Sequence, residues 1–384
     1  MLRQRCLLAI LVVAGIWLAP PVRAQSAATP PAIPTPPAAP TPAASAADDA
    51  AATPARNILG CLRDCICPEP DCQSPEGDWL CCYSPGVIGQ IDYLNWAARR
   101  TNLDYAAVIN PAQFPVPATG YTQLETLSLD FRRDDGLRAA IGYHFATQWD
   151  LTWTYTQFHT EGQTTLVPSD TMTLGLVATR SILTGTSVAN PVDKIEADGS
   201  IELRMHDIEG NWRYSLNETV GFRAFGGVRL AMLDEEFNNN YSYLFQGFLP
   251  ESGVIHQPVK MNAAGVRFGA ELEWRTRWGL QIFGRAAQSI LVADFQTQQF
   301  EQDTLNGPMI NQSNSSFQIV PVEEAAVGVG WSRGPWEVSA GYEVSDWFNM
   351  AQQARPVPPP PVGAVNTVQS LFLDGWFVRL ALTR

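Results

Sequence analysis

Apolar and polar residues alternate along much of this chain. The clearest example is 149–156, where Trp149, Leu151, Trp153 and Tyr155 alternate with one aspartate and three threonines. A period of two places the two sets on opposite faces of a β-strand. The same pattern predicts strands at 87–97, 103–109, 124–132, 137–145, 149–158, 201–214, 219–233, 262–275, 280–292, 317–331, 336–348 and 371–383.

No helical pattern lies between these segments to cover their apolar faces. A soluble sandwich would need a second sheet over each face, whereas the bilayer covers the outside of a barrel in lipid. Beyond the N-terminus, no segment approaches the ~18 uninterrupted apolar residues of a spanning helix. The sequence therefore predicts an all-β fold for 85–384, a transmembrane antiparallel up-and-down β-barrel of about 12 strands. A soluble β-sandwich is the alternative.

Short and long connections alternate between the predicted strands. Short turns fall at 146–148, 215–218, 276–279 and 332–335, and long polar loops fall at about 160–200, 234–261, 294–316 and 349–370. Outer-membrane barrels have short turns on the inner side and long loops on the outer side. We therefore expect short inner turns, long outer loops and an even number of strands.

The alternation also predicts which side chains face lipid and which face the lumen. The lipid-facing sets are Leu127, Leu129, Phe131; Leu137, Ala139, Ile141, Tyr143; Trp149, Leu151, Trp153, Tyr155; Val266, Phe268, Ala270, Leu272, Trp274; and Trp336, Val338, Ala340, Tyr342. The opposite parity carries charges that a wet lumen would hydrate or pair. The predicted pore-lining residues are Asp130, Arg132, Arg138, His144, Asp150, Arg223, Arg229, Arg267, Glu271, Glu273, Glu337, Glu343 and Arg379.

The N-terminus predicts export. Arg3 and Arg5 precede an apolar run over 6–18, and Val22-Arg23-Ala24 offers a cleavage site, so 1–24 is interpreted as a signal peptide. Removing its three arginines changes the net charge from −13 to −16, which argues against a nucleic-acid partner. Residues 25–56 are mostly Ala, Pro, Thr and Ser and predict a disordered tether in the periplasm, either a cell-wall spacer or a simple linker.

Residues 57–84 form a cysteine-rich segment that holds Cys61, Cys65, Cys67, Cys72, Cys81 and Cys82. In an exported protein an even number of close cysteines indicates disulfides, whose pairing stays open. Zinc is the competing interpretation, but the segment has no histidine and lacks two clean C-x-x-C pairs. C-x-x-C-H is absent as well, and we expect neither a cofactor nor a metal.

Several short motifs resemble one family in their order along the chain. They are Ile91-Asp92-Tyr93-Leu94-Asn95-Trp96, Gly136-Leu137-Arg138 with Gly142-Tyr143, Trp149-Asp150-Leu151 through Thr154-Tyr155, Gly226-Gly227-Val228-Arg229, and Leu373-Asp374-Gly375-Trp376-Phe377-Val378-Arg379-Leu380. Together they resemble the Legionella-type major outer-membrane protein family of pore-forming barrels over about 85–384. The resemblance implies an outer-membrane porin for ions and small hydrophilic solutes. Members of such families usually end on an aromatic residue, whereas this sequence ends on Arg384.

The expected partners are outer-membrane lipid, the barrel assembly machinery and, through the tether and cysteines, the cell wall or other envelope proteins. A barrel enzyme, a lipase or protease, is one alternative to the porin. The histidines are His144, His159, His206 and His256, and neither G-x-S-x-G nor H-E-x-x-H accompanies them, so we expect no catalysis. A non-conducting surface structural or adhesive barrel is the other alternative, with polar loops at 238–241 and 311–316 as its binding segments.

Overall fold

The computed structural model describes residues 86–101, 103–109, 123–146, 148–167, 175–181, 192–245, 249–351 and 369–383. Every regular element within these ranges is a β-strand. The described part of the chain has no helix long and apolar enough to cross a membrane. The predicted signal peptide, tether and cysteine-rich segment, with all six of its cysteines, lie outside the described residues.

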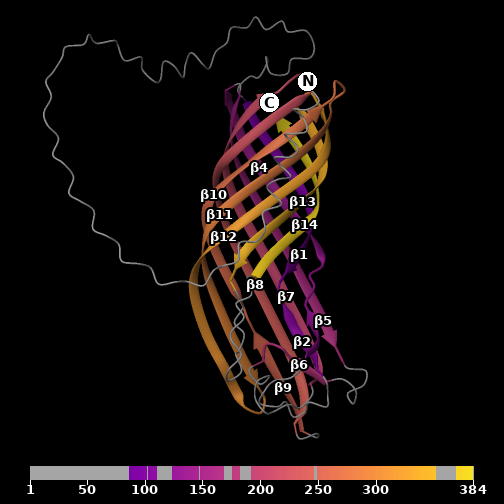
Figure 1. Cartoon of the computed structure of the whole chain (residues 1–384), viewed down its shortest axis with the longest axis vertical. Helices are drawn as coiled ribbons and strands as arrows, with labels where there is room; N and C mark the ends of the chain where they lie inside the picture. Colours follow the sequence, from indigo (N-terminus) through magenta and orange to yellow (C-terminus); the bar gives the residue numbers. More distant parts are fainter. Residues whose placement is uncertain are drawn as a thin grey trace, which may run out of the picture. The chain divides into compact units, whose positions relative to one another are not determined.

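Ten antiparallel strands close into a ring, which confirms the predicted barrel (Figure 1). Around the ring the order is β1, β4, β5, β7, β8, β10, β11, β12, β13 and β14, and β14 pairs with β1. These strands are β1 (Gly86–Arg100), β4 (Arg133–Ala146), β5 (Trp149–Leu166), β7 (Val192–Ser215), β8 (Val220–Phe245), β10 (Val259–Arg275), β11 (Leu280–Asp303), β12 (Gly307–Arg333), β13 (Trp336–Met350) and β14 (Gln369–Thr383).

The predicted short turns all lie at one end of the ring, here called the turn end. They join β4 to β5, β7 to β8, β10 to β11 and β12 to β13. The beginning of β1 and the end of β14 lie there too, because Ile88 pairs with Thr383 and Gly86 pairs with His144. Gly279 and Gly334 adopt positive φ angles of 84° and 60° in two of these turns, a conformation that glycine adopts without a Cβ clash.

At the other end, four strands continue far beyond their neighbours. β8 pairs with β9 (Leu249–His256) over Asn238–Phe245, and β9 pairs in turn with the end of β11. β9 and β10 pair with successive parts of β8 and are separated only by Gln257 and Pro258. The pairing is interrupted there because proline has no N–H to donate to a ladder. We call the distal parts of β7, β8, β11 and β12, with β9, the outer extension. Much of the sequence predicted as long loops is therefore strand.

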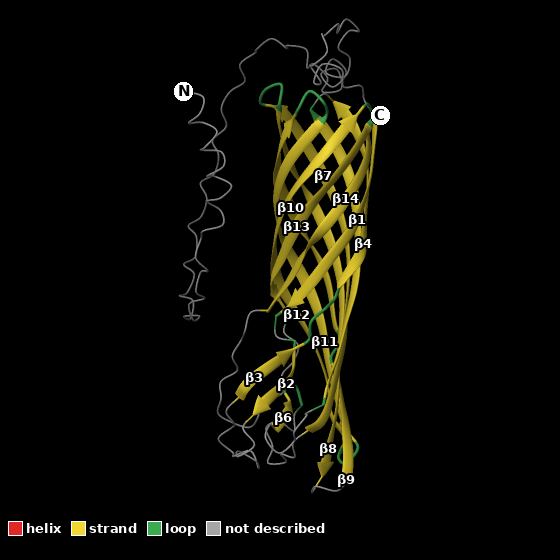
Figure 2. Ribbon diagram, turned by 90° about the vertical axis from the view of Figure 1, so that its right-hand side faces the viewer, coloured by secondary structure: helices red, strands yellow, loops and turns green. Residues whose placement is uncertain are grey.

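A second, three-stranded sheet accounts for the difference from about twelve barrel strands. β2 (Asp104–Ile109) pairs with β3 (Gln123–Ser128) and with β6 (Gly175–Ala178), and none of the three joins the ring (Figure 2). The segments 103–109 and 124–132 thus leave the wall with ten strands. The predicted lipid-facing residues Leu129 and Phe131 are instead buried, at 3% and 9% exposure. A short alternating segment looks the same in sequence whether its apolar side meets lipid or protein.

Buried polar contacts hold the small sheet and its flanking residues against the outer extension. The Arg180 guanidinium lies 4.5 Å from the centre of the Phe237 ring and donates to Gln257 Oε1 at 2.7 Å. On β8, Asn239 Nδ2 donates to the carbonyl of Tyr105 at 2.9 Å. The inward face of the extension is therefore covered by 104–107 together with Leu176, Ala178, Arg180 and Ser181, all of which are buried.

Two tyrosines on the inward face of the extension bind acidic side chains of β11. Tyr241 donates to Glu301 at 3.1 Å, and Tyr243 donates to Asp303 at 2.7 Å. Burial raises the pKa of both phenols, and the adjacent carboxylates raise it further. Both tyrosines therefore remain protonated hydrogen-bond donors at neutral pH.

The outward face of the ring is apolar, as predicted for the other four sets. Tyr93, Leu151, Val266, Val338 and Val378 are each about half exposed, with nothing of the described chain covering them. Tryptophans gather near the turn end of this face, at 149, 274, 331 and 336, and Trp278 in a turn is 86% exposed. An apolar wall bordered by aromatic side chains is the exterior of a barrel that lipid surrounds.

Candidate functional site

The lumen holds the candidate site, because most of the predicted charged residues converge there. The inward parity of each strand changes character along its length. On β8 it runs Arg223, Arg229, Leu233, Glu235 from the turn end toward the extension. The lumen accordingly has three levels: charged side chains nearest the turn end, apolar side chains next, and a buried ion pair beyond them.

Asp92 of β1 is the centre of one charged group. Arg379 donates to both of its oxygens at 3.0 Å, and Arg138 Nη1 lies 3.2 Å from Asp92 Oδ2. Arg138 also binds Glu343 at 2.9 Å, and Arg285 binds the other Glu343 oxygen at 3.2 Å. Since β4 and β13 are three strands apart around the ring, the Arg138–Glu343 contact is a chord through the lumen.

A second group surrounds Arg229 of β8. Its guanidinium binds Asp207 at 2.7 and 2.8 Å and Glu324 of β12 at 3.1 Å, and β8 and β12 are also three strands apart around the ring. Arg267 binds the same Glu324 at 2.8 Å and also contacts Glu209. The first group has three arginines and two carboxylates, and the second has two arginines and three carboxylates. Together they carry no net charge.

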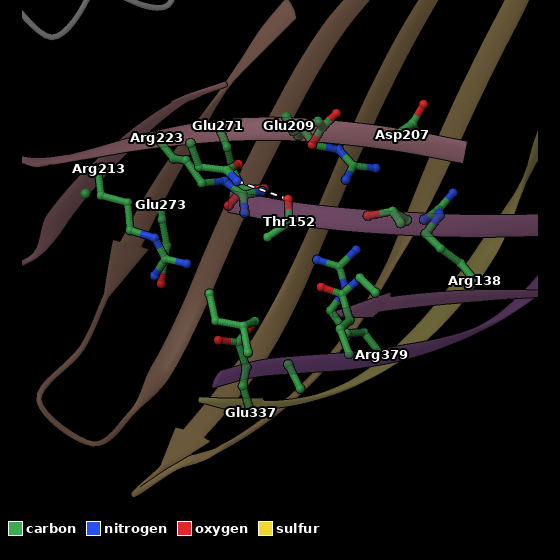
Figure 3. Close-up of a pocket in the computed structure, with 18 of the residues that line it drawn as sticks. Arg138, Thr152, Asp207, Glu209, Arg213, Arg223, Glu271, Glu273, Glu337 and Arg379 are labelled. Carbon is green, nitrogen blue, oxygen red and sulfur yellow. Dashed lines mark hydrogen bonds and ion pairs between the residues drawn. The ribbon is translucent and has the colours of Figure 1, made fainter. Parts of the chain in front are cut away.

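Between these groups and the turn end lies a cavity of about 250 Å³, here called the vestibule. Its lining extends from Ser332 and Gly334 at the β12–β13 turn to Arg229 and Glu324 in the middle of the ring. Figure 3 shows side chains such as Arg138, Arg379 and Glu337 entering this space from different strands. The vestibule therefore leads into the barrel from the turn end and is lined mainly by polar groups.

The remaining predicted lumen residues pair near the turn end, in part with Arg213 and Arg275, two inward arginines that were not predicted. Arg223 binds Glu271 at 2.7 Å, and Arg275 contacts Glu273 and lies 3.7 Å from Glu337. Asp150 accepts from Arg213 at 2.7 Å and contacts His144. His144 and Asp150 are each 1% exposed, so the wall encloses this histidine.

Beyond the charged groups the lumen is filled by apolar side chains, here called the apolar plug. They belong to one contiguous buried cluster and are each at most 3% exposed: Leu94, Trp96, Phe158, Leu203, Leu233, Met261, Leu291, Val320, Val322, Trp347, Leu371 and Leu373. Trp96 packs on Phe158 at a centroid distance of 5.4 Å, and its indole nitrogen donates to Glu343 at 3.1 Å. The side chains of the plug come from nine of the ten strands of the ring, all except β4.

A buried ion pair lies on the far side of the apolar plug. Arg100, at the end of β1, donates through Nε to Glu235 of β8 at 3.1 Å, and both side chains are 1% exposed. Its Nη2 donates to the carbonyl of Ala351 at 2.9 Å. β1 and β8 are four strands apart in a ring of ten, so this pair joins nearly opposite walls.

Eleven of the thirteen predicted pore-lining residues thus occupy the ring interior. Asp130 and Arg132 do not: both are exposed in the segment between β3 and β4, outside the ring. Sequence reasoning missed Asp92, Asp207, Glu209, Arg285 and Glu324, although parity along their strands places each of them inward. Among the described residues no group of three or more His, Cys, Asp or Glu side chains is arranged to hold a metal ion.

One comparison with known proteins identifies a family. A family model described as "Legionella pneumophila major outer membrane protein precursor" matches residues 90–383. No curated protein gives a significant match.

Similar solved structures include the outer membrane protease OmpT from Escherichia coli, at 10% identity and a TM-score of 0.41, covering 79% of this chain and 100% of that one. Another is the translocator domain of autotransporter NalP from Neisseria meningitidis, at 10% identity and a TM-score of 0.33, covering 80% and 91%. Because the family model covers 90–383, well over half of the chain, this chain belongs to the Legionella major outer membrane protein family, whose members are outer-membrane proteins.

Proposed function

We propose that this protein is a structural barrel of the outer-membrane surface whose lumen is closed to diffusing solutes. The apolar plug is the observation that supports this proposal. A hydrated ion entering the plug would have to lose water among side chains that offer no polar replacement, and such desolvation is costly. The outer extension, covered on its inward face by the small sheet, would then be the part that meets the cell's surroundings.

The pairing of the lumen charges supports the same proposal. A selectivity filter built from charged side chains must present those charges to a passing ion. Here the arginines and carboxylates of the two central groups bind one another at 2.7 to 3.3 Å, apart from the Arg267–Glu209 contact, and they cancel in net charge. Their role is better explained as bracing opposite walls than as lining a conducting path.

We also propose that the protein has no catalytic role. His144 and Asp150 are two of the residue types that form a catalytic triad. Asp150 also binds Arg213, however, and the barrel wall encloses the pair. A substrate could not reach this histidine without opening the barrel. The pair instead contributes to closing the wall next to the β4–β5 turn.

A porin is the second candidate, favoured by the polar vestibule that leads into the barrel from the turn end. Conductance of the purified full chain in a planar bilayer separates the two. A closed barrel gives no stepwise current, whereas current steps from the wild-type protein would support the porin. In that case the plug must move aside in the membrane.

A plug variant makes this measurement sharper. Leu94→Ala, Phe158→Ala and Trp347→Ala together remove three large side chains from the lumen, so we expect this variant to conduct if the plug is the barrier. A matched control carries Leu151→Ala, Trp153→Ala and Trp376→Ala, whose side chains are 52%, 47% and 60% exposed on the outward face. If both variants assemble and the plug variant stays silent, the plug is not the barrier.

A further inference from the structure

A polar cluster lies on the outward face of β14, β1 and β4, just beyond the apolar wall. The wall on these strands ends at Tyr93, Leu137 and Trp376, which are 45% to 60% exposed. The next outward residues toward the extension are Asn95, Asp135 and Asp374, followed by Arg99, Arg133 and Phe372. This change from apolar to charged side chains marks the outer edge of the lipid-facing surface.

Strand geometry places the two arginines near the headgroup level. Arg99 lies twelve residues from Val87, an exposed apolar residue at the turn end of the same strand. A strand tilted by about 40° rises roughly 2.5 Å per residue along the barrel axis, so Arg99 lies about 30 Å above Val87, against an apolar band of about 25 Å. Arg133 pairs with Ala97, two residues nearer the apolar wall.

Asp374 holds the two arginines side by side. It binds Arg99 Nη2 at 3.2 Å through one oxygen and Arg133 Nη2 at 3.4 Å through the other, and the Tyr342 hydroxyl also donates to it. The small side chain of Ala97 lies between Asp374 and Arg133 on the paired strands, which leaves room for this contact. The carboxylate is 6% exposed, whereas the two arginine side chains are 66% and 36% exposed.

The other groups of the cluster leave the arginines open toward the membrane surface. Asp135 accepts from the Tyr93 hydroxyl at 2.5 Å and from Asn95 at 3.0 Å, so neutral donors occupy it. The Arg99 guanidinium lies 5.7 Å from the Phe372 ring. Each guanidinium has five N–H donors, of which the contacts with Asp374 and the Asn95 carbonyl use only a part.

We propose that Arg99 and Arg133 bind the phosphate of an outer-leaflet lipid headgroup. Guanidinium groups bind phosphate through paired, charge-assisted hydrogen bonds, and these two are preset in position by a carboxylate beneath them. The lipid's acyl chains would lie along the apolar wall beside Tyr93 and Trp376. This site depends on the outward face and not on whether the lumen conducts.

The test compares two lipids that differ only in the phosphate, dioleoyl phosphatidic acid and dioleoylglycerol. The full chain in detergent is incubated with each, and the lipid retained is counted by native mass spectrometry. We expect the wild type to retain phosphatidic acid about tenfold better or more, the range of a few charge-assisted hydrogen bonds. An equal amount of inorganic phosphate should not displace it.

Arg99→Gln with Arg133→Gln should abolish this preference, while Arg204→Gln should preserve it. Arg204 is a matched control because it is an exposed outward arginine paired with Glu202 of its own strand. Heat-modifiable migration of each variant on gels establishes that the barrel has assembled. Equal retention of the two lipids by the wild type, displacement by inorganic phosphate, or a double variant that still prefers phosphatidic acid would each overturn the proposal.

Discussion

Replacing Glu235 by glutamine should destabilise the barrel by about 3–5 kcal/mol, the cost of leaving one partner of a buried ion pair without its opposite charge. The reason is the position of Arg100, which is 1% exposed and 3.1 Å from the Glu235 carboxylate. Water cannot replace the lost charge at this site. The Ala351 carbonyl, 2.9 Å from Arg100, would compensate only in part.

The adjacent residue supplies the control. Asp234 points to the outward face and lies 3.7 Å from Lys260, and these side chains are 46% and 66% exposed. Such a solvated pair contributes about 0–1 kcal/mol, so Asp234→Asn should have little effect. Glu235→Gln and Asp234→Asn each remove one negative charge, and they differ in that Glu235 faces the lumen whereas Asp234 faces outward.

The assay is denaturant unfolding of the detergent-folded protein, followed by tryptophan fluorescence. Arg100→Met combined with Glu235→Leu should recover most of the lost free energy of unfolding, because two apolar side chains suit the neighbouring plug and both charges of the pair are removed together. If Glu235→Gln and Asp234→Asn cost the same, the Arg100–Glu235 pair is not buried across the lumen and the reasoning fails.

Three further predictions concern the wall, a close strand contact and the extension. Leu151→Arg should impair assembly by placing a charge on the lipid face at a cost of about 2–4 kcal/mol, whereas Thr152→Arg, whose side chain lines the vestibule, should assemble; equal yields of heat-modifiable barrel would contradict the assignment of faces. Gly375→Ala should destabilise the β1–β14 pairing in denaturant unfolding, because the added Cβ would lie 2.1 Å from the Asn95 carbonyl oxygen. Gly89→Ala should be neutral in the same assay, because a Cβ added there would have no neighbouring atom within 4 Å. Burial raises the pKa of Tyr241, so its protonated form should stabilise the fold up to about pH 10, and this contribution should decline above that pH. In an ultraviolet titration, Tyr241→Phe should remove a phenol that ionises at a higher pH than an ordinary tyrosine. If no such phenol is lost, the prediction is wrong.

The outward wall and the turns could be predicted from the sequence because lipid imposes one rule on every strand. On β5, from Trp149 to Thr156, the outward residues are all apolar and the inward residues all polar, so a period of two is plain. The lumen imposes no such uniform rule. On β1 the inward residues are Asp92, Leu94 and Trp96 and the outward ones are Ile91, Tyr93 and Asn95, so both faces carry apolar and polar groups.

This mixture hid Asp92 and the apolar plug from sequence reasoning. The partners of the lumen charges were equally out of reach, since Arg138 and Glu343 are 205 residues apart and meet only because the ring brings β4 and β13 together. The strand count was affected by the small sheet, whose strands alternate as barrel strands do. A local pattern reports which residues share a face, but not what that face meets.

Glu343 also bears on the order in which the barrel is assembled. The first and last strands of the ring, β1 and β14, meet at a seam, and Glu343 on β13 binds Trp96 and Arg138 on β1 and β4 beyond it. These two contacts cannot form until β14 has paired with β1, so they belong to the last event of folding. Opening the ring at its seam would break them together with the β1–β14 ladder. We therefore expect the Glu343 carboxylate to slow the opening of the closed barrel at this seam.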